Sequence, residues 1–190
     1  MALTRNDFID DAALIGCEVE AVQAVCAVES NGGGFDPEGF PKTLFEGHWF
    51  YKLTNGKFAQ SNPTLCYPKW TREFYGKTWK AEKDRLAAAI KLDRNAALQS
   101  ASWGLFQIMG LNYARCGFAN VQDFVSAMCK DENAQLGAFT QYIIKSGLAD
   151  ELKDKRWADF ARLYNGPSYA QNAYDTKMAA AYAKAKAGTT

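Results

Sequence analysis

The chain has 190 residues, of which 48% are hydrophobic and 23% charged, a balance typical of a globular protein with a closed core. This length predicts one domain over residues 1–190. With a net charge of +1 and no block of lysine or arginine, a nucleic-acid partner is not expected. No run approaches the ~20 apolar residues of a membrane span, and the first residues lack the apolar segment of a secretion signal.

Cysteine and histidine usage argues against disulfides, metal sites and cofactors. Five cysteines form an odd set without a C-x-x-C spacing, and the chain has a single histidine, His48. Such a set predicts free thiols in a reducing compartment and offers no paired ligands for zinc or haem. We therefore expect a cytoplasmic protein that needs neither a metal nor a cofactor.

Helical patterns dominate the chain. Thr4 followed by Asp7 predicts a helix start, and this helix runs to about Ile15. A second helix begins near Glu18 and is ended by the glycines at 32–34. Further helices are predicted over residues 79–102, 121–129, 132–147, 155–166 and 168–187.

Residues 35–66 differ in character from the rest of the chain. The stretch "FDPEGFPKTLFEGHWF" holds two prolines and a Pro-Glu-Gly turn signal, and it lacks a lasting helical period. It predicts a short hairpin or three-stranded piece followed by a brief helical turn. The expected fold class is mainly α with a small β insertion at about 35–66, which gives two lobes and a cleft between them.

Glu29 stands where an aliphatic residue would pack better. Val22, Val25, Cys26 and Glu29 follow the i, i+3, i+4, i+7 spacing, so they share one face of the second helix. Desolvation beside that apolar face and the negative end of the helix dipole both raise the pKa of a carboxyl group. A carboxyl still protonated near neutral pH is what a general acid requires. The alternative is that Glu29 faces solvent or bonds the glycine-rich turn.

Five blocks of sequence resemble the N-acetylmuramidase family of phage endolysins. They are "AVESNGGGF", "GFPKTLFEGHWFYKLT", "ASWGLFQIMGLNY", "ENAQLGAF" and "FARLYNGPSY", and they span nearly the whole chain in family order. The resemblance implies a lysozyme-like fold and cleavage of the β-1,4 bond between N-acetylmuramic acid and N-acetylglucosamine in peptidoglycan, without cofactor. It also implies a monomer without a separate wall-binding domain, made in the host cytoplasm and reaching the wall after release.

The resemblance assigns two carboxylates. Glu29 matches the catalytic acid of the family, Glu46 in "LFEGH" matches its second motif carboxylate, and His48 matches the histidine beside it. Asp36 and Glu38 stay open as alternatives for the second carboxylate. A structural alternative for Glu46 is an acid that ties the β-piece to the helical body.

Two further motifs supply candidate substrate contacts. In "SWGLFQIMG", Ser102, Gly104 and Gln107 are candidates, with Gln107 positioned to bond an acetamido group or Glu29. By resemblance to lytic transglycosylases, the Tyr164 hydroxyl points toward the catalytic acid and Asn165 lines the sugar cleft. The candidate sugar-stacking rings, for each of which core packing is the alternative, are Trp49, Tyr51, Trp103 and Tyr113.

Three functions remain open from the sequence. A muramidase would use Glu29 with a second carboxylate, whereas a lytic transglycosylase would use Glu29 alone as acid and then as base. A non-catalytic glycan-binding helical module would use Glu29 only for packing.

Overall fold

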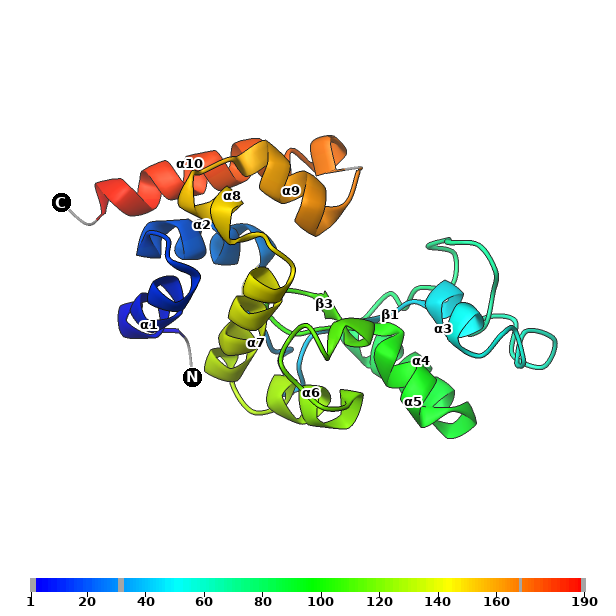
Figure 1. Cartoon of the computed structure of the whole chain (residues 1–190). Coiled ribbons are helices and arrows are strands. Elements are labelled where there is room, and N and C mark those ends of the chain that lie inside the picture. The colour runs from blue at the N-terminus through cyan, green and yellow to red at the C-terminus, as the bar shows by residue number, and fades with distance from the viewer. Residues whose placement is uncertain (1–2, 31–32, 168, 189–190) are drawn as a thin grey trace.

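The computed structural model describes residues 3–30, 33–167 and 169–188. Helices dominate these residues, and three short strands accompany them (Figure 1). The elements are α1 (Arg5–Ile15), α2 (Val19–Glu29), β1 (Thr43–Phe45), α3 (Gly47–Leu53), α4 (Trp79–Leu92), α5 (Arg94–Gln99), β2 (Ala101–Trp103), β3 (Ile108–Met109), η1 (Gly110–Asn112), α6 (Val121–Met128), α7 (Glu132–Lys145), α8 (Ala149–Lys153), α9 (Trp157–Asn165), η2 (Tyr169–Asn172) and α10 (Tyr174–Ala187). No helix in the described ranges combines the length and apolar composition needed to cross a bilayer.

The first two helices have the expected bounds. The Asp7 carboxylate accepts hydrogen bonds from the backbone N–H and the hydroxyl of Thr4, which fixes the start of α1. Gly16 takes the left-handed conformation at φ 79° and ends that helix. Helix α2 ends at Glu29, and of the predicted terminating glycines Gly32 lies outside the described residues.

The helix predicted over residues 79–102 is in fact two helices. Asp93 leaves the helical conformation, and its carboxylate accepts from the backbone N–H of Ala96, so it caps the start of α5. Residues 101–102 belong to a strand. Helix α6 begins after Asn120 as predicted, because the Asn120 side chain accepts from the Asp123 N–H.

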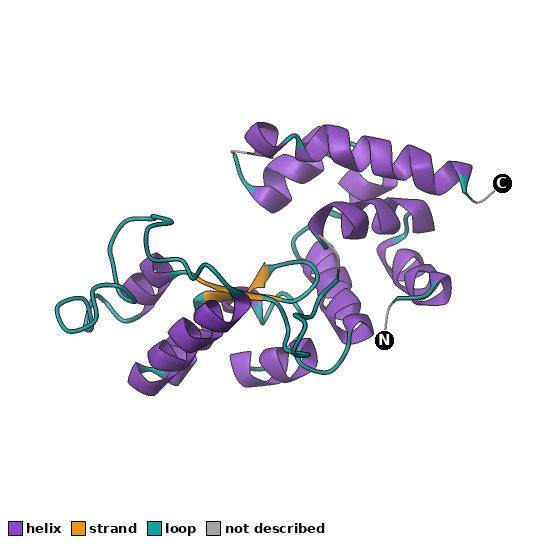
Figure 2. Cartoon of the chain, turned by 180° about the vertical axis from the view of Figure 1, so that it is seen from behind, coloured by secondary structure: helices purple, strands orange, loops and turns teal. Residues whose placement is uncertain are grey.

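The sheet is assembled differently from the prediction. Only β1 comes from residues 35–66, where an isolated bridge between Phe35 and Pro41 is the other β feature described. Strand β1 pairs with β2 and β2 pairs with β3, both antiparallel, with Leu44 opposite Ser102 and Ser102 opposite Met109. Figure 2 shows this sheet between the helical body and the end formed by α3 and its following loop. A local turn pattern predicted the strand correctly but did not reveal its distant partners.

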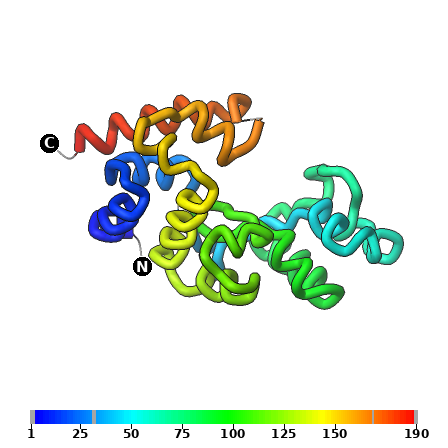
Figure 3. Tube along the Cα trace, in the orientation of Figure 1, coloured from blue at the N-terminus to red at the C-terminus, as the bar shows by residue number. Residues whose placement is uncertain are grey.

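Helix α2 is the central helix of the amino-terminal half. It packs against α10 and α1, and Figure 3 shows α2 and α10 side by side. At its start, Glu18 accepts hydrogen bonds from Lys155, Tyr182 and Lys186 at 2.7 to 2.9 Å. These donors lower the pKa of Glu18 to about 2, so the carboxylate stays charged and joins α2 to α10.

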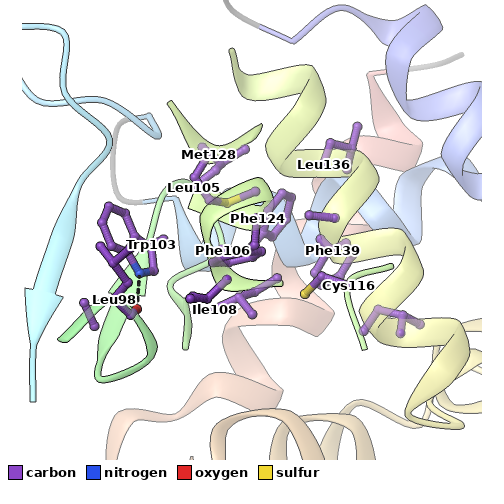
Figure 4. Packing of buried hydrophobic residues seen from close by; sticks show 14 of the residues in the cluster. Leu98, Trp103, Leu105, Phe106, Ile108, Cys116, Phe124, Met128, Leu136 and Phe139 are labelled. Carbon is purple, nitrogen blue, oxygen red and sulfur yellow. Dashed lines mark hydrogen bonds between the residues drawn. The ribbon is translucent and has the colours of Figure 1, made fainter. Parts of the chain in front are cut away.

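The core continues behind the sheet. Phe106 stacks on Phe139 with ring centroids 4.2 Å apart, and this pair joins the β2–β3 turn to α7 (Figure 4). The indole N–H of the buried Trp103 donates to the carbonyl of Leu98 at 3.1 Å, as the dashed line in Figure 4 shows. Buried aromatic rings therefore hold the sheet on the helices.

Gln135 of α7 links three segments in the interior. Its side chain is 1% exposed, its Oε1 accepts from the backbone N–H of Leu105 at 2.6 Å, and its Nε2 donates to the carbonyl of Met128 at 2.8 Å. A Cβ at Gly34 or Gly104 would collide with this amide, so both positions require glycine. The amide thus holds the β2–β3 turn against α7.

We predict that Gln135→Leu destabilises the fold by about 2–4 kcal/mol, because it leaves a buried N–H and a buried carbonyl without partners. Chemical denaturation followed by circular dichroism measures this. Gln141→Leu on the same helix is the control, since that half-buried side chain makes no hydrogen bond within the described residues. Equal stability of the two variants would contradict the role given to Gln135.

Candidate active site

Glu29 lies at the carboxyl end of α2, one turn beyond a fully buried apolar face. Val22 and Val25 are 0% exposed, while Glu29 itself is only half-buried. Its Oε1 accepts a hydrogen bond of 2.8 Å from Nδ2 of Asn165, the last residue of α9. The end of α9 therefore fixes the carboxyl group at the end of α2.

The environment favours the neutral form of Glu29. Burial raises the pKa of the Glu29 carboxyl, and the bond from Asn165, which favours the charged form, offsets only part of that effect. The Oδ1 atom of Asn165 is buried and has no protein partner. An Asn165 amide turned by 180° would place this acceptor against the O–H of a protonated Glu29. The pKa direction agrees with the sequence prediction.

Two hollows meet at Glu29. They share Glu29, Gln107 and Tyr174, so together they form one groove that passes the carboxyl group on both sides. The first hollow encloses about 540 Å³ and the second about 460 Å³. The first is lined by Ala27, Val28, Glu29, Ser30, Lys42, Trp79, Gly104, Gln107, Asn172, Tyr174 and Lys177. The second is lined by Glu29, Leu44, Glu46, Arg72, Ser102, Phe106, Gln107, Ile108, Met109, Asn112, Tyr142, Tyr164, Asn165 and Tyr174.

Glu46 shares the second hollow with Glu29. It precedes α3, and its Oε2 accepts a hydrogen bond of 2.7 Å from the hydroxyl of Tyr75. Burial raises the pKa of Glu46, while the Tyr75 bond and the charges of Arg85 and Arg72 lower it. Glu46 therefore has cationic neighbours that stabilise its ionised form, whereas the only group that lowers the pKa of Glu29 is a neutral amide.

His48 lies beside Glu46 but does not line either hollow. Its Nδ1 is 3.3 Å from Oε2 of Glu46, yet this nitrogen makes no hydrogen bond of acceptable geometry. Burial and the charge of Lys52 lower the pKa of His48, so the imidazole is neutral at pH 7 and forms no true ion pair. The structure places His48 behind Glu46, away from the groove.

The other two acids considered for the second carboxylate point elsewhere. Oδ1 of Asp36 accepts from the backbone N–H groups of Glu38 and Phe40 at 2.9 and 3.0 Å, which closes the turn they belong to. Glu38 is exposed and pairs with Lys83. Neither acid lines the groove, so Glu46 is the second carboxylate that shares a hollow with Glu29.

The predicted motif at 102–107 does form part of the groove. Ser102 lines the second hollow, Gly104 the first, and Gln107 both. Gln107 has a left-handed backbone at φ 48°, and its Nε2 donates to the carbonyls of Lys42 and Gly104 at 3.2 and 2.9 Å. Its Oε1 accepts from the Ser102 hydroxyl at 2.9 Å. The expected bond between Gln107 and Glu29 is therefore not present, because the protein itself uses the amide.

Tyr164 and Asn165 both line the second hollow. The Tyr164 hydroxyl donates to the carbonyl of Phe106 at 3.0 Å rather than to Glu29, which corrects the expected orientation. The charge of Glu29 nevertheless contributes to raising the pKa of the Tyr164 phenol, which indicates that the two groups are close. Asn165 contacts Glu29 directly, a role that its sequence position did not reveal.

The aromatic rings of the groove differ from those expected. Trp49, Tyr51, Trp103 and Tyr113 line neither hollow, and Trp103 is a core residue. The rings on the groove are Trp79, Tyr142, Tyr164 and Tyr174. Trp79 is 47% exposed and is the first residue of α4, so a large exposed ring at a helix start was the available signal. Within the described ranges no group of three or more potential ligands is placed to hold a metal ion.

We predict that Glu29→Gln stabilises the fold at pH 7. The pKa of Glu29 is higher in the folded chain than its ordinary 4.5, so the folded state binds more protons in that window. Wild-type stability therefore falls as pH rises from 4.5 through the raised pKa, and the amide removes this loss. Thermal unfolding from pH 4 to 8 should show a gap between variant and wild type that opens with rising pH.

Glu73→Gln is the control for this measurement, because Glu73 is exposed and away from the groove. A Glu29→Gln curve that runs parallel to the wild-type curve across the whole range would show that burial does not favour the neutral acid.

Comparison with known proteins agrees with this arrangement. The model of the family described as N-acetylmuramidase matches residues 18–186. The crystal structure of a Burkholderia AP3 phage endolysin superposes with a TM-score of 0.91 at 37% sequence identity, over 99% of this chain and 72% of that chain. No curated protein matched the sequence. The predicted resemblance to phage endolysins is thus confirmed, and the chain belongs to the N-acetylmuramidase family.

Proposed function

We propose that this chain hydrolyses the β-1,4 bond between N-acetylmuramic acid and N-acetylglucosamine in peptidoglycan during phage-induced host lysis. Family membership supports a peptidoglycan hydrolase, and the similarity to a phage endolysin supports the setting. The observation that carries the proposal is Glu29, a buried carboxyl with a raised pKa at the junction of two hollows.

Glu29 acts as the general acid in this proposal. A glycan strand in the groove has sugar units on both sides of Glu29, so the bond to be broken lies next to its carboxyl group. The neutral acid donates its proton to the glycosidic oxygen and so turns a poor leaving group into an alcohol. The bond to Asn165 holds the carboxyl in place without supplying a cation that would ionise it.

Glu46 acts as the second carboxylate. Arg72 lines the same hollow, and Arg85 and Tyr75 also favour the charged form of Glu46. An ionised carboxylate there either stabilises the oxocarbenium-like transition state or activates the attacking water. Two acids whose surroundings separate their protonation states are the arrangement that glycoside hydrolysis needs. It also argues against a non-catalytic glycan-binding module, which has no use for such a pair.

One observation favours a second candidate, a lytic transglycosylase. Glu46 is engaged by the Tyr75 hydroxyl, as expected for an acid that holds the loop after α3 in place. In that case Glu29 would act first as acid and then as base, and a hydroxyl of the substrate would replace water. The two candidates differ in their dependence on Glu46.

The cellular setting rests on the endolysin similarity. We place synthesis in the host cytoplasm, action at the wall after release, and a monomer as the working form. The five cysteines are all unpaired, which fits a reducing compartment. Peptidoglycan is the one partner this proposal requires.

We predict that Glu29→Gln lowers the rate of clearing of outer-membrane-stripped Gram-negative cells by at least about 100-fold, the cost of a lost general acid. The variant is expected to be at least as stable as wild type, so a loss cannot be assigned to unfolding. Glu73→Gln should clear cells at the wild-type rate. Equal clearing by Glu29→Gln and Glu73→Gln would refute the assignment.

We predict that Glu46→Gln lowers the initial rate of sacculus solubilisation by at least about tenfold under the hydrolytic mechanism, because a neutral amide neither stabilises positive charge nor activates water. Tyr75→Phe is the companion variant: it keeps the carboxylate and removes the donor, so it should cost less. Wild-type rates in Glu46→Gln would instead support the transglycosylase candidate.

A further inference from the structure

We propose that the first hollow binds an anionic substituent of the glycan, namely a carboxylate of the stem peptide or of the lactyl ether, through Lys177 and Lys42. The inference rests on the proposed function, because it names the part of the substrate that one arm of the groove recognises. It makes Lys177 a determinant of specificity rather than of chemistry.

The two arms of the groove differ in charge. The first hollow is lined by two cations, Lys42 and Lys177, and by no acid other than Glu29. The second hollow is lined by Glu29 and Glu46 against one cation, Arg72. With Glu29 neutral, the first hollow carries two positive charges, whereas an ionised Glu46 balances Arg72 in the second. An anion is therefore attracted to the first arm and not to the second.

Lys42 is held firmly in this arm by its backbone. Its N–H donates to the carbonyl of Gly34 at 2.9 Å, and its own carbonyl accepts from the Gly104 N–H at 2.8 Å and from the Gln107 side chain. The Lys42 ammonium lies 5.6 Å from the centroid of the Trp79 ring. A fixed cation and an aromatic surface thus lie together on the wall that leads away from Glu29.

Lys177 comes from α10 on the other side of the same hollow. It is exposed and forms no ion pair within the described part of the chain, whereas Lys186 of the same helix is bound to Glu18 at 2.9 Å. Lys184, also exposed, lines a separate hollow near Arg5 and Gln23. Among the three α10 lysines named here, Lys177 is therefore the one that combines a free ammonium group with a place in the groove.

Trp79 separates the contribution of the sugar from that of the charge. It lines the first hollow and a neighbouring one that also reaches Gln107 and Leu44, so the ring extends the groove beyond the two lysines. A sugar ring packs its apolar face on such an indole whether or not it bears a carboxylate. Loss of Trp79 should weaken binding of all glycans alike, and loss of Lys177 should weaken binding of anionic glycans alone.

The test is binding by the Glu29→Gln protein, which leaves the ligands uncleaved. Three soluble ligands are compared by calorimetry: glycan strands with stem peptides, the same strands after amidase removes the peptides, and neutral oligomers of N-acetylglucosamine. We expect the anionic strands to bind more tightly than the neutral oligomer, and the preference to shrink as salt is raised. A preference that survives amidase treatment assigns the lactyl carboxylate, and one that disappears assigns the stem peptide.

Added in this background, Lys177→Gln should weaken binding of the anionic ligand about two- to fivefold, the range for one exposed charge pair. It should leave the neutral oligomer unaffected, and Lys177→Arg should restore binding. Lys184→Gln is the matched control and should change neither affinity. Trp79→Ala should weaken binding of both ligands.

Equal affinity for anionic and neutral glycans, or equal behaviour of Lys177→Gln and Lys184→Gln, would overturn the inference. These outcomes are independent of the chemistry. A protein that fails to cleave sacculi while Lys177 still selects anionic strands would sink the proposed function and leave the subsite standing.

Discussion

The buried amide of Gln135 is the constraint on which the groove depends. It bonds the backbone at Leu105 and at Met128, and Gly34 and Gly104 pack against it because neither carries a side chain. The chain that leaves α2 after Glu29 and the turn between β2 and β3 are therefore held against the same helix. The walls on either side of the carboxyl group are fixed by one hydrogen-bonded side chain in the core.

Electrostatics then divides the work between two similar acids. Both are partly buried, and burial raises the pKa of each. Glu46 has Arg72, Arg85 and Tyr75 as neighbours that favour its charge, whereas Glu29 has only the amide of Asn165. The same kind of side chain is thus suited to donate a proton at one position and to remain charged at the other.

Local signals in the sequence predicted much of this structure. The Thr4–Asp7 pair and Asn120 marked helix starts, and helical periodicity placed Glu29 beside an apolar face, which gave the direction of its pKa. These features depend on neighbours within a few turns. The family resemblance added Glu46, which a periodicity argument does not single out.

Long-range pairings could not be predicted from one sequence. Asn165 reaches Glu29 across 136 positions, and β1 finds its partners in β2 and β3 rather than nearby. Gln107 was predicted to contact substrate or Glu29, but the carbonyls of Lys42 and Gly104 and the Ser102 hydroxyl occupy its amide. In each case a partner brought close by folding decides the role of the residue.

The most direct test of the central claim is the mass of the glycan ends that the wild-type protein releases from purified sacculi, with Glu29→Gln as the blank. Hydrolysis predicts reducing N-acetylmuramic acid ends that have gained one water, formed by the wild type and not by the variant. Anhydro ends, lighter by one water, would contradict hydrolysis, and ends formed equally by the Glu29→Gln protein would contradict the role of Glu29.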